Sequence, residues 1–248
     1  MNPLTDLHCH LLPGIDDGAQ TLDDTRALLD AAAEQGVDEL VFTPHFYPER
    51  TDAQTFLRDR ETARQEIAGL PEARGIRWRV GAEIRITPFL AELPLPELAF
   101  SGTRYLLLEL DFDHEPFDVR GVIQRLRERD YTPILAHIER YPYVQEDPEL
   151  LYEWVKAGAL AQINAGALLH DAKTKKRLAQ YCRRDLVHEI ASDAHSAEHR
   201  PVNLAEGYRA LPRDLAEKLR GNARRIFAGQ ALGQPAPAPP KRRFGLWA

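Results

Sequence analysis

Apolar runs that are typical of buried strands alternate along the chain with stretches of helical periodicity. The expected strands cover residues 4–8, 39–43, 78–84, 105–110, 133–136, 159–163 and 187–192. The expected helices lie between Thr21 and Gly36 and over residues 53–68, 119–129, 148–157, 173–182 and 212–219. Such alternation predicts an α/β protein with a parallel sheet, either open and doubly wound or closed into a barrel. The periodicity by itself does not choose between the two.

Residues at the boundaries support these helices. Thr21 can cap the first helix, Asp24 stands at the capping-box position, and Gly36 can end it. Pro148 and Pro212 suit the first turn of two later helices, where a missing N–H costs nothing. The pattern therefore predicts where helices start as well as where they lie.

Length and composition fit one globular domain. A chain of 248 residues with 44% hydrophobic and 28% charged residues can fold as a single α/β barrel. We expect this domain to cover residues 1–232. Residues 233–248 begin with a segment rich in Pro and Ala, and we expect them to form a mobile tail.

Charge and hydropathy narrow the possible partners and the compartment. The formal net charge of -6 gives no global electrostatic reason to expect a nucleic acid. The chain starts without the basic and apolar segments of a signal peptide, and no run approaches the roughly 18 apolar residues of a spanning helix. We therefore expect a cytoplasmic protein that does not insert into a membrane. Two cysteines allow at most one disulfide and say little about compartment.

Side chains that can bind metals follow nearly every predicted strand except the sixth. They are His8 and His10 after the first strand, Asp17 in the loop beyond it, then His45, Glu83, Glu109 and His137, and finally Asp193 with His195. One such residue alone would be an ordinary polar side chain at a strand end. In an α/β barrel, however, the carboxyl ends of the strands form one face, so these side chains would converge there.

The residue types indicate a metal centre for phosphate chemistry. His8 and His10 are two apart on a strand and point the same way, whereas Cys9 points oppositely and is expected to be packed. Imidazole with carboxylate suits manganese, iron or zinc better than calcium. The set is large enough for two or three divalent ions, with Glu83 or Asp193 able to bridge, as in sites that direct water at phosphorus.

The ordered motifs resemble the PHP-type (polymerase and histidinol phosphatase superfamily) bacterial protein-tyrosine phosphatases of capsule and exopolysaccharide loci. The match runs from about residue 4 to about residue 228. Its motifs are His8-Cys9-His10, Pro13-Gly14-Ile15-Asp16-Asp17-Gly18, Thr43-Pro44-His45, Gly81-Ala82-Glu83-Ile84, Ala136-His137-Ile138-Glu139-Arg140-Tyr141 and Ser192-Asp193-Ala194-His195. The resemblance implies a distorted (β/α)7 barrel, a trinuclear centre usually containing manganese, and hydrolysis of phosphotyrosine on tyrosine kinases that control polysaccharide export.

The same resemblance implies a role for each residue. One metal would be held by His8, His10, Glu83 and Asp193, a second by Glu83, Glu109 and His137, and a third by Asp17, His45 and His195, with Asp16 as the alternative to Asp17. Arg140 and Arg200 stand where the family places phosphate-binding arginines, which can grip phosphate oxygens and stabilise developing charge.

This chain departs from the family at a few positions. Phe46 stands where members often carry a histidine, and Ile138 where proline is usual. His114, in an unusual loop over residues 111–116, could face substrate but is expected to be exposed. His170, His188 and His199 are expected to be structural or surface residues.

Other functions compete with this interpretation. A cysteine-based phosphatase needs an arginine six positions after its cysteine, and Ile15 and His188 occupy those positions. Within the superfamily, a small-molecule phosphatase such as a histidinol-phosphate phosphatase is the main alternative, and a polymerase-associated exonuclease is a weaker one. A metal-stabilised scaffold that binds a phosphoprotein without hydrolysing it is the non-catalytic alternative.

Overall fold

Parallel strands form the centre of the molecule in the computed structural model, which describes residues 3–233, 237–240, 242–243 and 246–247. The strands are β1 (Leu4–Cys9), β2 (Val37–Phe42), β3 (His45–Phe46), β4 (Arg77–Val80), β5 (Glu83–Arg85), β6 (Tyr105–Glu109), β7 (Thr132–Leu135), β8 (Leu160–Asn164) and β9 (Glu189–Ala191). Their pairing follows the orders β1-β2-β4 and β3-β5-β6-β7-β8-β9. Each predicted strand is present.

The two sheets join into one closed barrel. The backbone N–H of Gly81 donates to the carbonyl of Phe42 at 2.8 Å, and that of Glu83 donates to Pro44 at 3.0 Å, so β2 continues into β3 and β4 into β5. On the other side Cys9 forms a parallel bridge with Ala194. This bridge closes the circle between β1 and the chain after β9. Of the two predicted architectures, the barrel is therefore confirmed.

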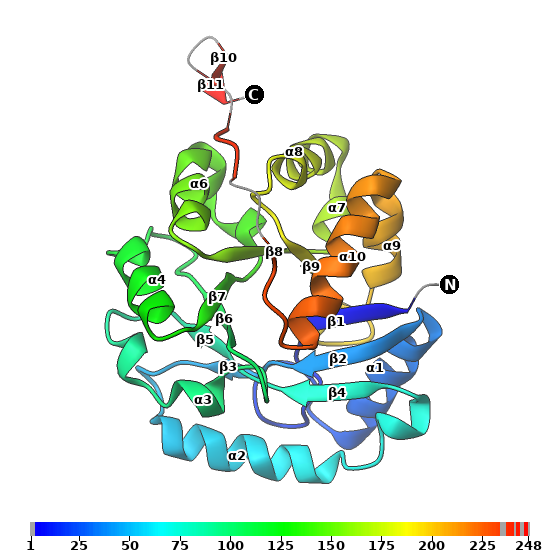
Figure 1. The fold of residues 1–248 in the computed structure, drawn as a ribbon. Helices are drawn as coiled ribbons and strands as arrows, with labels where there is room; N and C mark the ends of the chain where they lie inside the picture. The colour runs from blue at the N-terminus through cyan, green and yellow to red at the C-terminus, as the bar shows by residue number, and fades with distance from the viewer. Residues whose placement is uncertain (1–2, 234–236, 241, 244–245, 248) are drawn as a thin grey trace.

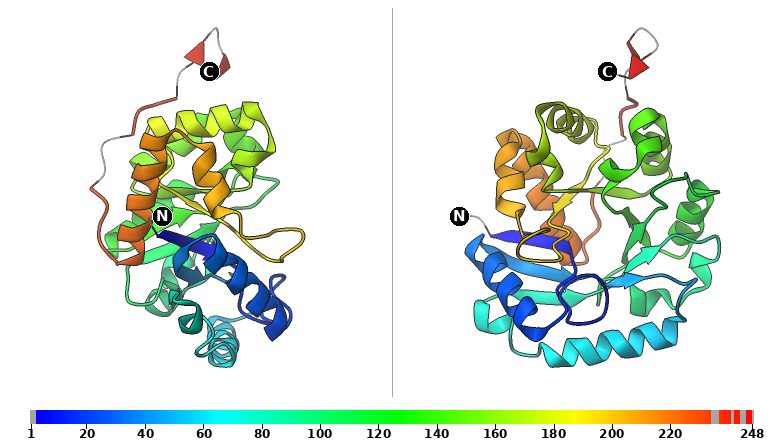
Figure 2. Two further views of the ribbon diagram at one scale, coloured as in Figure 1. Left: turned by 90° about the vertical axis from the view of Figure 1, so that its right-hand side faces the viewer. Right: turned by 180° about the vertical axis from the view of Figure 1, so that it is seen from behind.

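Helices surround the barrel on its outer side (Figures 1 and 2). They are α1 (Leu22–Glu34), α2 (Ala53–Glu66), α3 (Leu95–Leu98), α4 (Val119–Glu128), α5 (Pro142–Glu146), α6 (Pro148–Lys156), α7 (Ala167–His170), α8 (Ala172–Arg183), α9 (Leu204–Ala210) and α10 (Arg213–Phe227). The predicted capping box of Thr21 and Asp24 is present at α1. Within the described residues, no helix is long and apolar enough to cross a membrane.

The structure corrects some boundaries. The predicted strand over residues 78–84 is divided at Gly81 and Ala82 into β4 and β5. Gly81 packs so closely that a Cβ there would lie 2.7 Å from the Phe100 ring. The predicted helix over residues 212–219 extends to Phe227, and Pro212 precedes it as the N-cap instead of opening its first turn. Pro148 does occupy the first turn of α6, as expected.

Apolar side chains fill the barrel toward the strand starts. Leu7, Leu107 and Ile134 are fully buried there, in a cluster with Ile226 and Phe227 of α10. The Tyr105 hydroxyl at the start of β6 donates to the carbonyl of Gln230 at 2.7 Å, just beyond α10. Helix α10 thus closes this end and leaves the carboxyl ends of the strands for polar groups.

The predicted mobile tail falls partly outside the described residues, which omit 234–236, 241, 244–245 and 248. Within the described part, the backbone N–H of Ala238 donates to the carbonyl of Arg184 at 3.0 Å. Two short strands, β10 (Arg242–Arg243) and β11 (Leu246–Trp247), pair antiparallel. The mobility of the tail and the division at residue 232 stay predictions.

Candidate metal centre

All nine predicted ligands lie on one face, at the carboxyl ends of the barrel strands. They are His8 on β1, His10 directly after it, Asp17 in the following loop, His45 on β3, Glu83 on β5, Glu109 at the end of β6, His137 after β7, and Asp193 and His195 after β9. The loops after β1 and β9 project from the same side of the barrel (Figure 2). Eight of the nine fall into three groups whose donor atoms lie within 4.8 Å of one another, with His45 and His10 each shared by two groups.

Four donor atoms converge in the deepest group. The Nε2 atoms of His8 and His10 are 3.0 Å apart, and Glu83 Oε2 lies 3.3 Å from each. Asp193 Oδ1 is 3.3 Å and 3.5 Å from the same two nitrogens. Donors around one tetrahedral ion, at bonds of roughly 2.0–2.2 Å, lie about 3.4 Å apart. His8, His10 and Asp193 therefore form a group whose spacing suits one divalent cation, and Glu83 Oε2 lies beside its two imidazoles.

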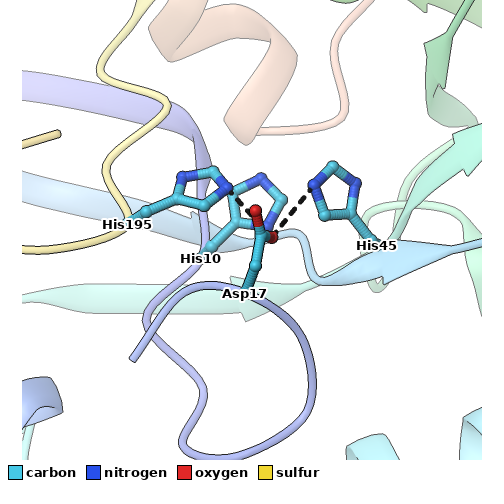
Figure 3. A group of neighbouring side chains, drawn as sticks. All are labelled: His10, Asp17, His45 and His195. Atoms are coloured by element: carbon cyan, nitrogen blue, oxygen red, sulfur yellow. Dashed lines mark ion pairs between the residues drawn. The ribbon is translucent and has the colours of Figure 1, made fainter. Parts of the chain in front are cut away.

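A second group gathers at the mouth of the site (Figure 3). Asp17 Oδ1 lies 3.4 Å from the Nε2 atoms of both His45 and His195. The neighbouring Asp16 instead accepts hydrogen bonds from His10 Nδ1 at 2.7 Å and from the backbone N–H of His45 at 3.0 Å. Asp17 thus lies in the cluster of possible metal ligands, whereas Asp16 contacts the other ring nitrogen of His10.

Glu83 connects the groups. Its Oε1 atom is 2.8 Å from His137 Nε2, and its Oε2 atom is 2.9 Å from His45 Nδ1. Glu109 Oε1 lies 3.9 Å from His137 Nε2, and Glu109 also clusters with His45 and Glu83. A carboxylate that meets four imidazoles, presented by β1, β3 and the end of β7, is well placed for the predicted bridging role.

The backbone is strained where it presents two of these side chains. His137 and Asp193 adopt positive φ angles of 31° and 53°, a region that non-glycine residues seldom occupy. Such conformations cost about 1–3 kcal/mol each and persist only when the surroundings impose them. The loop also leaves no room for a side chain at Gly18, because a Cβ there would lie 2.0 Å from the carbonyl oxygen of His10.

The electrostatics of the centre favour bound cations. Burial alone would lower the pKa of His8, yet the charges of Glu83 and Asp193 raise it to about 9. Burial likewise opposes protonation of His45, but Glu83 and Asp17 raise the pKa of its imidazole to about 11. The imidazoles hold their protons firmly because buried carboxylates surround them with negative charge, and metal ions can take the place of those protons, since metal binding displaces protons from the ligands.

Unpaired buried atoms show that the donor set fits metal ions. Glu83 Oε2, Asp193 Oδ1 and His195 Nε2 are buried without a hydrogen-bond partner in the described part of the chain. Buried polar atoms almost always have a hydrogen-bond partner, and a bound metal ion would supply the contact that these three atoms lack. Sulfur is not part of the set, since Cys9 is fully buried and points its thiol at the carbonyl of Val41.

Sequence reasoning missed the contribution of the sixth predicted strand, β8. Gln162 Oε1 lies 3.2 Å from His8 Nδ1 and accepts the backbone N–H of His137 at 2.7 Å. Asn164 Nδ2 donates to Asp193 Oδ2 at 2.7 Å. The available signal was a pair of amides at the end of an otherwise apolar strand. Neither is charged, and both act by orienting the proposed ligands.

The two predicted phosphate-binding arginines lie together beside Asp193. Arg200 Nη2 is 2.5 Å and Arg140 Nη1 3.7 Å from Asp193 Oδ2. Both arginines line a hollow of about 500 Å³, which we call the arginine hollow. They can therefore meet an anion at the centre from the same direction.

An aromatic hollow opens on the other flank of the centre. Its volume is about 640 Å³, and Asp17, His45, Tyr47, Phe56 and Ile15 are among its lining residues. The Tyr47 ring stacks on the imidazole of His45 with centroids 5.2 Å apart. An apolar, planar group can thus approach the metal ligands from this side.

His114, His188 and the two departures from the family supply no atom to the clusters of donors. His114 is exposed, with 90% of its side chain accessible, as expected. His188 is buried, and burial lowers its pKa to about 4. Phe46 and Ile138 are fully buried in the core. None of these four enters the clusters of donors.

Comparisons with known proteins agree with this geometry. The sequence matches the family described as "Capsular polysaccharide synthesis, CpsB/CapC" over residues 4–231. It is 31% identical to tyrosine-protein phosphatase YwqE of Bacillus subtilis, over 98% of this chain and 100% of the relative. It is 29% identical to tyrosine-protein phosphatase CpsB of Streptococcus pneumoniae, over 87% and 92% of the two chains.

Solved structures extend the comparison to the fold. One from work on YwqE of Bacillus subtilis and CpsB of Streptococcus pneumoniae, described as unique metal-dependent tyrosine phosphatases, aligns with a TM-score of 0.86 at 29% identity, covering 96% of this chain and 100% of that one. A histidinol phosphate phosphatase of Lactococcus lactis aligns with a TM-score of 0.56 at 18% identity, covering 87% and 93% of the two chains. The second likeness supports the fold alone.

The closed parallel barrel and its clustered imidazoles and carboxylates define the class, which is a PHP-type α/β barrel with a metal-binding face. Within that class, the chain belongs to the CpsB/CapC family of capsular polysaccharide synthesis.

Proposed function

We propose that this protein is a metal-dependent tyrosine-protein phosphatase that hydrolyses phosphotyrosine at the centre described above. The observation that carries the proposal is the convergence of nine metal-binding side chains and two arginines on the carboxyl face of the barrel, in a chain of the CpsB/CapC family. Relatives in that family are named tyrosine-protein phosphatases.

The ligands are proposed as carried over from the family, in three sets, the first two of which share Glu83. They are His8, His10, Glu83 and Asp193, then Glu83, Glu109 and His137, and finally Asp17, His45 and His195. Two or three divalent ions held there, manganese first with iron or zinc as alternatives, would activate water and neutralise phosphate charge when bound. The spacing of the first set supports its assignment most directly.

Arg140 and Arg200 hold the phosphoryl group in this proposal. Both guanidinium groups are partly exposed at the edge of the centre and already face a carboxylate oxygen of Asp193. A phosphate oxygen offers the same kind of acceptor, and charge-assisted contacts of this type strengthen as charge develops in the transition state. The guanidinium of Arg140 also lies 4.5 Å from the centre of the Phe112 ring, which supports its orientation.

The aromatic hollow would receive the tyrosine ring. The ring would lie against Tyr47, Phe56 and Ile15, beside Asp17 and His45. A phenolate leaving group, with a pKa of about 10, departs more readily than an alkoxide, so the reaction does not require a dedicated general acid. This favours an aryl ester over histidinol phosphate, which is an alkyl ester.

The physiological substrate in this proposal is a phosphotyrosine-bearing protein, namely the bacterial tyrosine kinase that regulates capsule or exopolysaccharide synthesis. The family description, which refers to capsular polysaccharide synthesis, supports that context. The reaction would take place in the cytoplasm.

Hydrolysis of phosphotyrosyl peptides, compared with histidinol phosphate and phosphoserine peptides, tests the proposal. Assays with added Mn²⁺ and with a chelator should run beside elemental analysis of the purified protein. We expect a preference for phosphotyrosine that is lost on chelation. A preference for histidinol phosphate would reassign the substrate, and metal binding without turnover of any ester would leave the non-catalytic scaffold.

A further inference from the structure

Helix α8 carries a strongly basic surface on a chain whose net charge is -6. Its segment Ala172–Arg183 contains five basic residues and no acidic one. Lys173 and Lys176 are exposed, and within the described residues neither takes part in an ion pair; the nearest pairs join His170 to Asp171 and Lys218 to Asp185. The positive charge of this helix is therefore not neutralised by the fold.

Part of this basic surface lines a concave site. Lys173, Lys176, Arg177 and Arg184 border a hollow of about 350 Å³, which we call the α8 hollow. Tyr181 lines it as well, is only 6% exposed, and has a hydroxyl without a hydrogen-bond partner among the described residues. A buried hydroxyl without a partner is unfavourable, and a carboxylate oxygen in the hollow would give it an acceptor.

The α8 hollow adjoins the arginine hollow, because Gln145 and Arg177 line both. Arg177 borders the α8 hollow and also the arginine hollow, where Arg140 and Arg200 lie beside Asp193. His170 and Thr174 line the arginine hollow between these groups. A chain segment leaving the centre in this direction would pass over a surface whose charged groups are mostly cations.

We infer that the α8 hollow binds an acidic segment of the phosphoprotein substrate, at a position next to the phosphotyrosine but outside the catalytic centre. The inference rests on the proposed function and adds a recognition site to it. Charge complementarity of this kind selects partners and speeds their encounter. Pro240 of the protein's own tail borders the same hollow, but it offers no charge to balance the cations.

Adjacent lysines give a matched pair of variants. Lys176 lines the α8 hollow, whereas the equally exposed Lys175 lines neither hollow. Lys176→Glu and Lys175→Glu make the same change in net charge one residue apart. The substrates are phosphotyrosyl peptides with acidic residues before the phosphotyrosine, after it, or on neither side, and p-nitrophenyl phosphate as a substrate without flanks.

We expect the wild-type protein to prefer one acidic peptide, with a preference that weakens as salt is added. Lys176→Glu should raise KM for that peptide about fivefold, leaving kcat and the turnover of p-nitrophenyl phosphate unchanged. Lys175→Glu should change each value by less than about twofold. Equal effects of the two variants, or no preference for acidic flanks in the wild type, would overturn the inference.

If the proposed function is wrong, the wild-type protein will not hydrolyse p-nitrophenyl phosphate, and this result is distinct from a failure of the α8 hollow. In that case, binding of a fluorescent acidic peptide, measured by anisotropy, still tests the α8 hollow with the same two variants. Thermal melting shows whether each variant is folded. Binding to phosphatidylserine vesicles that is lost in Lys176→Glu, with no peptide preference, would assign the surface to a membrane and contradict the inference.

Discussion

The two ends of the barrel are built in opposite ways. At the carboxyl end, Glu83 and Asp193 are buried with unpaired oxygens, and His137 and Asp193 have left-handed backbones. At the other end, Leu107 and Phe227 pack in an apolar cluster that α10 closes. One end therefore carries strain and unsatisfied polar groups, while the other contributes burial of apolar surface.

The carboxyl end should therefore determine the chemistry of the protein, and the apolar end should determine its stability. Binding of metal ions would give the buried polar atoms at the carboxyl end their partners. The free energy that these atoms cost is therefore regained only in the metal-bound protein. The apolar cluster itself needs no ligand. Substitutions at the carboxyl end should consequently change activity and metal content, whereas substitutions at the apolar end should change the free energy of unfolding.

The largest effect is expected from Glu83→Gln. The amide keeps the shape of the side chain but removes the negative charge that faces His8, His10, His45 and His137. We expect phosphatase activity to fall by about 10³-fold or more, with loss of bound metal, because one carboxylate serves several donor groups. Metal analysis and peptide hydrolysis check this, and addition of Mn²⁺ should raise Tm in the wild type but much less in the variant. Glu92→Gln, at an exposed position, is the control.

Arg200→Ala should have the next largest effect. Removing one donor to the phosphoryl group should lower kcat by about 10²–10³-fold while metal content is retained. Arg200→Lys should recover only part of the loss, because an ammonium group lacks the two-pronged geometry of guanidinium. If metal content fell together with kcat, the role of Arg200 would be to support Asp193 instead of binding phosphate.

Much of this organisation could be predicted from the sequence because the signals are local. Apolar runs mark the strands, and a histidine or carboxylate directly after such a run must emerge at the carboxyl end. His45 and Glu83 were found in this way, although the pattern did not show that the strand divides near Gly81, so that Glu83 pairs with β3.

The remaining features depend on tertiary contacts that no local pattern reveals. Gln162 is an uncharged residue in an apolar strand, and only the closed barrel brings it to His8 and His137. The choice between Asp16 and Asp17 depends on which side chain turns toward His10 in a folded loop. Helices as short as α7 (Ala167–His170) have too few residues to show a periodicity.

Gln162→Ala tests whether the amides that orient the proposed ligands contribute to metal binding at the carboxyl end of the barrel. The substitution removes the partner of His8 Nδ1, and groups that orient metal ligands typically change metal affinity by 10–100-fold. We expect a decrease in metal affinity within about that range, with activity largely restored at saturating Mn²⁺. Titration with Mn²⁺ measures both quantities. An unchanged affinity would show that His8 is held by its backbone alone, and Gln54→Ala on the exposed side of α2 is the matched control.

Leu107→Ala is expected to have the smallest effect on catalysis and so sharpens the contrast from the other end. Leu107 is fully buried in the cluster that includes Phe227 of α10. Truncation should lower the free energy of unfolding by about 2–5 kcal/mol, because it removes apolar contacts and leaves a cavity. Leu169→Ala, at a leucine that is 47% exposed, should change stability by less than about 0.5 kcal/mol. Below the melting transition, kcat of Leu107→Ala should stay within about twofold of the wild type, since Leu107 pairs with Glu83 through the backbone but its side chain packs in the apolar cluster and supplies no donor atom. Denaturant unfolding and kinetics should be measured on the same sample. A large fall in kcat of the folded variant would mean that packing at the apolar end sets the positions of the metal ligands. The two ends would then form one cooperative unit.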